Sequence, residues 1–170
     1  MQLFVPAQMI FNKQQVIQNG EVFRFKTAPI DPSDPFRGKY IILNFEENTF
    51  PVDSAAGWEK GNDAYLTLTK DSNNFAKVNA CLLSPPPDIN NFVKAKVYYI
   101  ESYNPTVIRL QYPFEKFYLE ESKAPAAEAA YIKASRSKDT NTYALVSVYK
   151  GDAALQDVIV NGKSVRDLKP

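Results

Sequence analysis

The chain has 170 residues, a length that predicts one domain. Hydrophobic residues make up 45% of it and charged residues 23%, and 20 basic against 19 acidic side chains leave a net charge of +1. This balance is typical of a soluble globular domain and argues against non-specific electrostatic binding to nucleic acid or anionic lipid. The chain has no histidine, which excludes Ser-His-Asp and Cys-His nucleophilic sites and every His-ligated metal site.

The single cysteine, Cys81, has no partner for an intramolecular disulfide and cannot build a thiolate metal cluster alone. It lies in an apolar run, so we expect a small, buried hydrophobic side chain. No stretch approaches the roughly 20 consecutive apolar residues that cross a bilayer, and residues 1–6 lack the basic region of a signal peptide. The sequence therefore predicts a soluble chain with no metal site and no cofactor.

The first element expected in chain order is a helix of about two turns, capped by Asn12 and ended by Gly20. Alternating, β-branched and aromatic residues then predict strands at residues 22–26, 39–45, 64–69, 75–80, 92–100, 106–112, 143–149 and 154–160. Polar turn clusters predict hairpins at residues 70–74, 102–105 and 150–152.

A second helix is expected over residues 122–134, which are rich in alanine and carry Pro125 in the first turn. Many short strands and two short helices predict a mainly β fold (β-rich α+β), an antiparallel sandwich or a barrel-like domain. We expect one domain over residues 1–170, with residues 1–20 as an N-terminal arm and short helix.

The densest local motif is a proline-rich stretch before the second predicted strand. Two Asp-Pro steps, at Asp31 and Asp34, predict a rigid double turn. Arg37 is near enough in sequence to pair with either carboxylate, and Gly38 permits a positive φ just before Tyr40. Two interpretations stay open: a structural corner whose carboxylates accept backbone hydrogen bonds, or a clamp for an anion or ligand centred on Arg37.

This stretch and the octet that follows it, GKYIILNF, resemble the GDYXXLXY protein family, whose members carry the run PVDPRDPFRGDY. The resemblance extends to residues 12–28, 112–128 and 144–163, and so covers nearly the whole chain. The sequence departs from the family's pattern at Lys39, where the family has Asp, and at Phe45, where it has Tyr. If that Asp carries chemistry in the relatives, this chain cannot perform it; a simpler interpretation is an exposed strand start that tolerates either charge.

The biochemical role of the family is uncharacterised. Its members are bacterial proteins with an N-terminal transmembrane helix followed by a domain outside the cytoplasmic membrane, and they often occur beside or fused to multi-pass membrane proteins. The resemblance therefore implies a periplasmic location, a membrane anchor that would precede Met1, and a multi-pass membrane protein as partner. It implies no nucleic-acid partner.

Two functions follow from these observations. The first is a non-catalytic binding module, because aromatic residues make up 13% of the chain and tyrosine suits interfaces. Its expected interface residues are Trp58, Tyr112, Phe117 and Tyr118, although alternating strands also bury aromatic rings and Trp58 can equally fill a core. The second is a hydrolase-like enzyme that uses carboxylates or a Ser-Lys pair around the motif. No spacing selects a catalytic residue, so the sequence favours the binding module.

Overall fold

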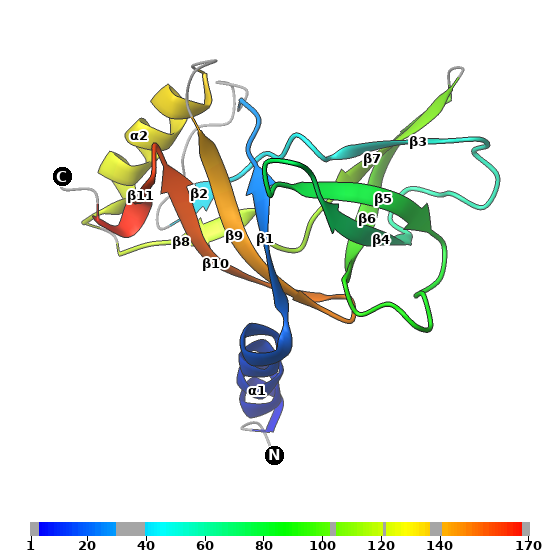
Figure 1. Ribbon diagram of the computed structural model, residues 1–170, viewed down its shortest axis with the longest axis horizontal. Helices are drawn as coiled ribbons and strands as arrows, with labels where there is room; N and C mark the ends of the chain where they lie inside the picture. The colour runs from blue at the N-terminus through cyan, green and yellow to red at the C-terminus, as the bar shows by residue number, and fades with distance from the viewer. Residues whose placement is uncertain (1–3, 30–39, 103–104, 121, 137–140, 168–170) are drawn as a thin grey trace.

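The computed structural model describes residues 4–29, 40–102, 105–120, 122–136 and 141–167. In this part of the chain, strands dominate and all their pairings in named strands are antiparallel. Two α-helices accompany them, α1 (Phe4–Asn19) and α2 (Ala124–Ser135). The predicted mainly β class is confirmed. Figure 1 shows two β units side by side, with α1 projecting away from both and α2 beside the first.

The first unit is a four-stranded sheet with the order β1-β9-β10-β11. Its strands are β1 (Glu21–Lys26), β9 (Thr142–Tyr149), β10 (Asp152–Val160) and β11 (Lys163–Ser164). The alternation in β1 buries Phe23 and Phe25 and exposes the residues between them, as the period-two pattern predicts. The buried ring of Tyr131 on α2 belongs to the same hydrophobic core.

The second unit is a nearly closed five-stranded barrel with the order β3-β7-β6-β4-β5. Its strands are β3 (Thr49–Val52), β4 (Asp63–Lys70), β5 (Ala76–Leu82), β6 (Phe92–Glu101) and β7 (Thr106–Gln111). The three predicted hairpins are confirmed, because β4/β5, β6/β7 and β9/β10 are antiparallel neighbours. Strands β3 and β5 form the two free ends of the sheet.

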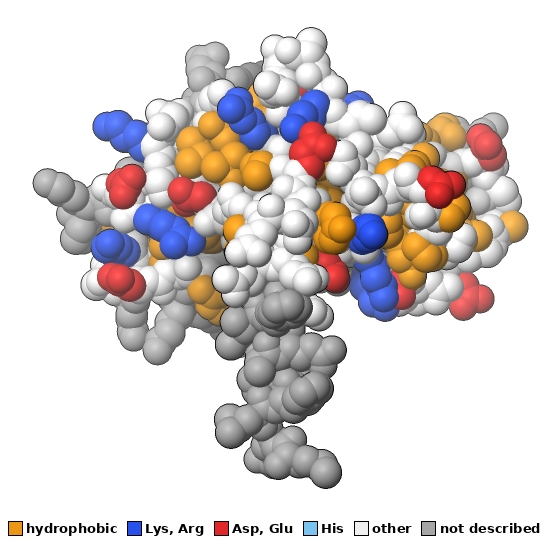
Figure 2. Space-filling view, turned by 60° about the horizontal axis from the view of Figure 1, so that its bottom comes forward, with side chains coloured by type: hydrophobic (Ala, Val, Ile, Leu, Met, Phe, Trp, Pro, Cys, Tyr) orange, Lys and Arg blue, Asp and Glu red, His pale blue; other side chains and the backbone are white. Residues whose placement is uncertain are grey.

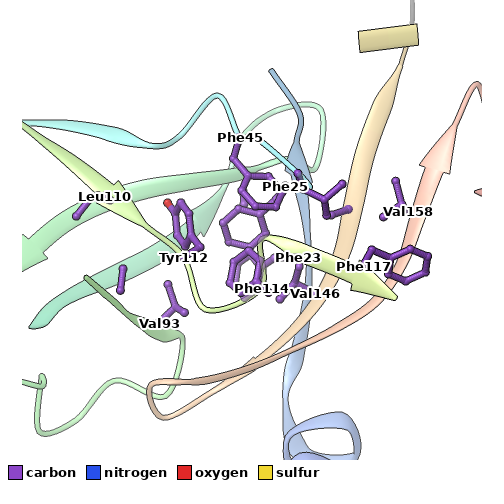
Figure 3. Packing of buried hydrophobic residues seen from close by; sticks show 14 of the residues in the cluster. Phe23, Phe25, Phe45, Val93, Leu110, Tyr112, Phe114, Phe117, Val146 and Val158 are labelled. Carbon is purple, nitrogen blue, oxygen red and sulfur yellow. The ribbon is translucent and has the colours of Figure 1, made fainter. Parts of the chain in front are cut away.

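A cluster of aromatic rings joins the two units. The rings of Phe25, Phe45, Tyr112 and Phe114 contact one another with centroids 5.0–5.7 Å apart, mostly edge to face. Figure 3 shows these four rings between Leu110 of the barrel and the side chains of the first sheet. Edge-to-face contacts place the positive edge of one ring against the negative face of another. The cluster therefore favours one relative orientation of the rings in addition to burying apolar surface.

The turn between β9 and β10 makes a second joint. Gly151 has a φ of +94°, and its N–H donates to the carbonyl of Phe92 at 2.9 Å while its own carbonyl accepts from the N–H of Lys94 at 2.9 Å. A side chain here would meet the ring of Phe92, because an added Cβ would lie 2.9 Å from Phe92 Cε2. Glycine therefore satisfies both the turn and the close approach to β6.

The elements differ from the predicted ones in three ways. The expected helix start at Asn12 is wrong: α1 begins at Phe4, and Pro6 is tolerated because a first-turn N–H has no partner within the helix. The predicted strand over residues 39–45 is shorter, since only β2 (Tyr40–Ile42) is regular. Short strands β3, β8 (Lys116–Tyr118) and β11 were not expected, because two to four residues are too few to establish an alternating pattern.

Candidate binding groove beside the β2–β8 ribbon

The proline-rich motif lies largely outside the described residues. Asp31, Asp34, Arg37 and Gly38 belong to residues 30–39, so the clamp centred on Arg37 stays a prediction. Tyr40 is described, and it begins β2.

Strand β2 pairs with β8, and this pairing brings together two segments that resemble the family and are distant in sequence. Tyr40 lies opposite Tyr118, and Ile41 lies opposite Phe117. The tyrosine rings have centroids 5.4 Å apart, and the Nζ atom of Lys116 lies 4.9 Å from the centroid of the Tyr40 ring. Tyr40 and Tyr118, which the sequence offered for separate reasons, therefore form one aromatic pair beside a cation.

A groove of about 430 Å³ borders this ribbon. Most of its lining is the continuous segment 111–118, which turns from β7 into β8. The remaining lining comes from α1, β10 and the 3₁₀-helix η1 (Val165–Asp167), which contribute Lys13, Ala153, Leu155 and Arg166. No local sequence pattern links Lys13, Lys116 and Arg166, because they come from three separate elements.

The carboxylate of Glu115 braces the turn along the groove. Its two oxygens accept hydrogen bonds from the backbone N–H of Tyr112 at 3.1 Å and from the Gln111 side-chain amide at 3.2 Å. Burial raises the pKa of this carboxyl group, although both hydrogen bonds and nearby Lys116 act in the opposite direction. Through its two hydrogen bonds, Glu115 therefore holds the conformation of the turn that lines the groove.

Arg166 lies over the ring of Phe117, with its Cζ atom 5.0 Å from the ring centroid. Its Nη2 donates to the carbonyl of Gln156 at 3.0 Å, and its Nε is 3.7 Å from an oxygen of Asp157. These contacts position the guanidinium, but the side chain remains about half exposed (55%). Arg166 can therefore still contact a ligand in the groove.

The four aromatic residues expected at an interface have different surroundings. Tyr112 and Phe117 are core residues, each 3% exposed, because the β7–β8 segment turns their rings inward. Both residues still belong to the lining of the groove. Tyr118 is 65% exposed, whereas Trp58 is half-buried and packs against the core.

Trp58 lines a second groove, of about 480 Å³, between β3 and β5. Cys81 lies in the same lining, and burial raises its pKa to about 12. The thiol is thus kept protonated at neutral pH, which fits the expected hydrophobic role although the side chain is only partly buried.

The adjacent carboxylates of Glu46 and Glu47, which precede β3, have structural partners. The Glu47 carboxylate accepts from Lys77 Nζ at 2.9 Å and from the Val78 N–H at 3.0 Å, and Glu46 pairs with Lys26 at 3.2 Å. Among the described residues, no group of three or more Asp, Glu and Cys side chains could hold a metal ion.

The fold and the groove define an antiparallel β protein with an open, cation-bearing groove beside its two-stranded β2–β8 ribbon. The chain belongs to the GDYXXLXY family, since the model described as GDYXXLXY protein matches residues 2–158. The resemblance inferred from the sequence is confirmed. No curated protein and no solved structure gave a significant match. Within the described part of the chain, neither helix has the length and apolar character needed to cross a membrane.

Proposed function

We propose that this domain is a non-catalytic binding module that works outside the cytoplasmic membrane, in the periplasm, with a multi-pass membrane protein. The observation that carries the proposal is the pairing of β2 with β8. It places two family-like segments side by side and leaves the Tyr118 ring exposed at the edge of the groove. An exposed aromatic ring beside cations is a common anchor at protein interfaces.

Position-specific photocrosslinking tests this function. A photoreactive phenylalanine analogue replaces Tyr118 in the full chain, which is then incubated with membranes of the source organism. The matched control carries the analogue at Tyr99 on β6, which is also exposed (54%). We expect a multi-pass membrane protein to crosslink from position 118 and not from position 99. Equal crosslinking from both positions, or none from 118, would contradict the proposal.

The location is tested separately in intact cells. In the full-length gene product, a cysteine replaces Tyr99 in a Cys81→Ala background, so that the only thiol in these 170 residues is at an exposed position. We expect a membrane-impermeant maleimide that passes the outer membrane to label this thiol without lysis. Labelling that requires disruption of the cytoplasmic membrane would overturn the periplasmic assignment.

A further inference from the structure

The described lining of the groove carries unbalanced positive charge. Its charged residues are three cations, Lys13, Lys116 and Arg166, and one carboxylate, Glu115. Neither Lys13 nor Lys116 has an ion-pair partner among the described residues, whereas Arg166 has Asp157 at 3.7 Å. The chain as a whole has a net charge of only +1, so this excess is a property of the groove.

The single carboxylate of the described lining offsets only part of the excess, since one acidic group that interacts with Lys116 faces three cations. Glu115 is turned toward the backbone of Tyr112 and the Gln111 amide, where it braces the turn. An oxygen of Asp157 on β10 lies 3.7 Å from the Arg166 Nε, and Nη2 donates to the carbonyl of Gln156, so only the remaining guanidinium N–H groups can donate to a ligand. The groove thus offers positive charge to whatever enters it.

The groove also offers apolar surface between its cations. Pro113, Ala153 and Leu155 belong to the lining, and the exposed ring of Tyr118 lies at one end of the lining segment. Figure 2 shows apolar patches beside charged side chains of both signs on the face from which α1 projects. A ligand that matches this lining combines several separated negative charges with apolar side chains.

We infer that this groove binds an extended acidic segment of a protein partner. Carboxylates of the segment pair with Lys13, Lys116 and Arg166, and its intervening apolar side chains rest on Pro113, Ala153 and Leu155. A volume of about 430 Å³ is enough for a few residues of such a chain. The inference rests on the proposed function, to which it adds the chemistry of the partner.

The test uses the full 170-residue chain and a fluorescent synthetic peptide of about ten residues that alternates Glu with Leu and Ser. Two matched peptides replace every Glu with Gln or with Lys. Fluorescence anisotropy is expected to show binding of the Glu peptide about tenfold tighter than that of the Gln peptide, and none of the Lys peptide. Raising the salt concentration should weaken the binding severalfold, because screening shortens the reach of the charges.

Substitutions locate the binding site. Lys13→Gln and Lys116→Gln are each expected to weaken binding of the Glu peptide by about fivefold, and the double variant by more than tenfold. Lys60→Gln is the matched control. The Lys60 Nζ lies 5.7 Å from the centroid of the Tyr98 ring, much as the Lys116 Nζ lies near the Tyr40 ring, but Lys60 is not part of the groove lining. Unchanged circular dichroism and melting curves confirm that the variants fold.

Three results would overturn the inference: equal binding of the Glu and Gln peptides, an equal loss for Lys60→Gln, or stronger lysine-dependent binding to phosphatidylglycerol vesicles than to the peptide. The last result would assign the groove to a lipid surface. If the Glu peptide does not bind but a membrane protein still crosslinks from position 118, only the inference of an acidic segment is rejected. Failure of the crosslinking would reject the proposed function itself.

Discussion

The hydroxyl group of Tyr112 donates a hydrogen bond to the backbone carbonyl of Glu47, and so ties the end of β7 to the segment that leads into β3. The side chain of Glu47 continues the connection, because its carboxylate accepts from the N–H of Val78 and from Lys77 on β5. One residue pair therefore links three segments around the barrel. Burial is the main reason that the pKa of Tyr112 is raised above its usual range.

Replacing Tyr112 with Phe removes this hydrogen bond while keeping the ring in its aromatic cluster. We expect the free energy of unfolding to fall by about 1–2 kcal/mol, because the Glu47 carbonyl loses a buried donor. Urea denaturation measures the change. Tyr99→Phe serves as the control, since Tyr99 is exposed, and should shift stability by less than about 0.5 kcal/mol. A Tyr112→Phe variant as stable as the control would show that the hydrogen bond contributes nothing.

Phe25 tests the joint between the sheet and the barrel. Its ring is 1% exposed and contacts Phe45, Tyr112 and Phe114. Phe25→Ala should lower the free energy of unfolding by about 3–5 kcal/mol, while Phe25→Leu should cost less because it leaves a smaller cavity. Chemical denaturation followed by circular dichroism compares the two variants. Equal losses would mean that lost volume does not set the cost.

Gly151 and Gly162 separate backbone strain from steric clash. Both have a positive φ, +94° and +79°, but of the two only Gly151 would place a Cβ within 4 Å of other residues, 2.9 Å from the Phe92 ring and 3.8 Å from Lys94 Cβ. Alanine at Gly162 should cost about 1 kcal/mol for the left-handed backbone. Alanine at Gly151 should cost more, since the Phe92 ring must also move. Melting temperatures of the two variants measure the difference, and equal shifts would contradict a close approach at β6.

Asp63 should stabilise the barrel in a pH-dependent way. The ammonium groups of Lys94 and then Lys96, whose Nζ atoms lie 2.8 and 2.6 Å from the two carboxylate oxygens, lower the pKa of this carboxyl group. A lowered pKa in the folded state means that the stabilisation is present above the unfolded-state value of about 3.9 and is lost as the pH falls through the folded value. Asp63→Asn should therefore be less stable than the native chain at neutral pH. This deficit should shrink at about pH 3, and urea midpoints that differ equally at both pH values would refute the prediction.

Cys81 should make the folding stability fall as the pH rises, whereas Asp63 makes it fall as the pH drops. Burial raises its pKa to about 12, so the folded state keeps the thiol protonated while the unfolded chain ionises it above about pH 8.5. The stability of the native chain should therefore fall more steeply between about pH 8 and 11 than that of Cys81→Ala. The thiol should also react with a disulfide reagent at least about tenfold more slowly than an unfolded control. Parallel pH profiles for the two proteins would argue against this role.

The sequence alone determined the features that depend on neighbouring residues. Alternation identified β1 and β6, because successive side chains in a strand face opposite sides, and β-branched and aromatic residues identified β4. Polar turn clusters located three hairpins, and the motif before Tyr40 revealed the family. The start of α1 was placed wrongly, because Asn12 is a good capping residue but the helix needs no cap there.

Only the tertiary structure decided which aromatic residues are core and which are surface. Tyr112, Phe117 and Tyr118 lie within seven residues of one another, yet two are buried and one is exposed. The difference follows from the pairing of β8 with β2 and from the turn that Glu115 braces. The groove was equally beyond local patterns, since Lys13 and Arg166 come from opposite ends of the chain. Their proximity depends on long-range packing of α1, β10 and η1, which a short sequence window does not contain.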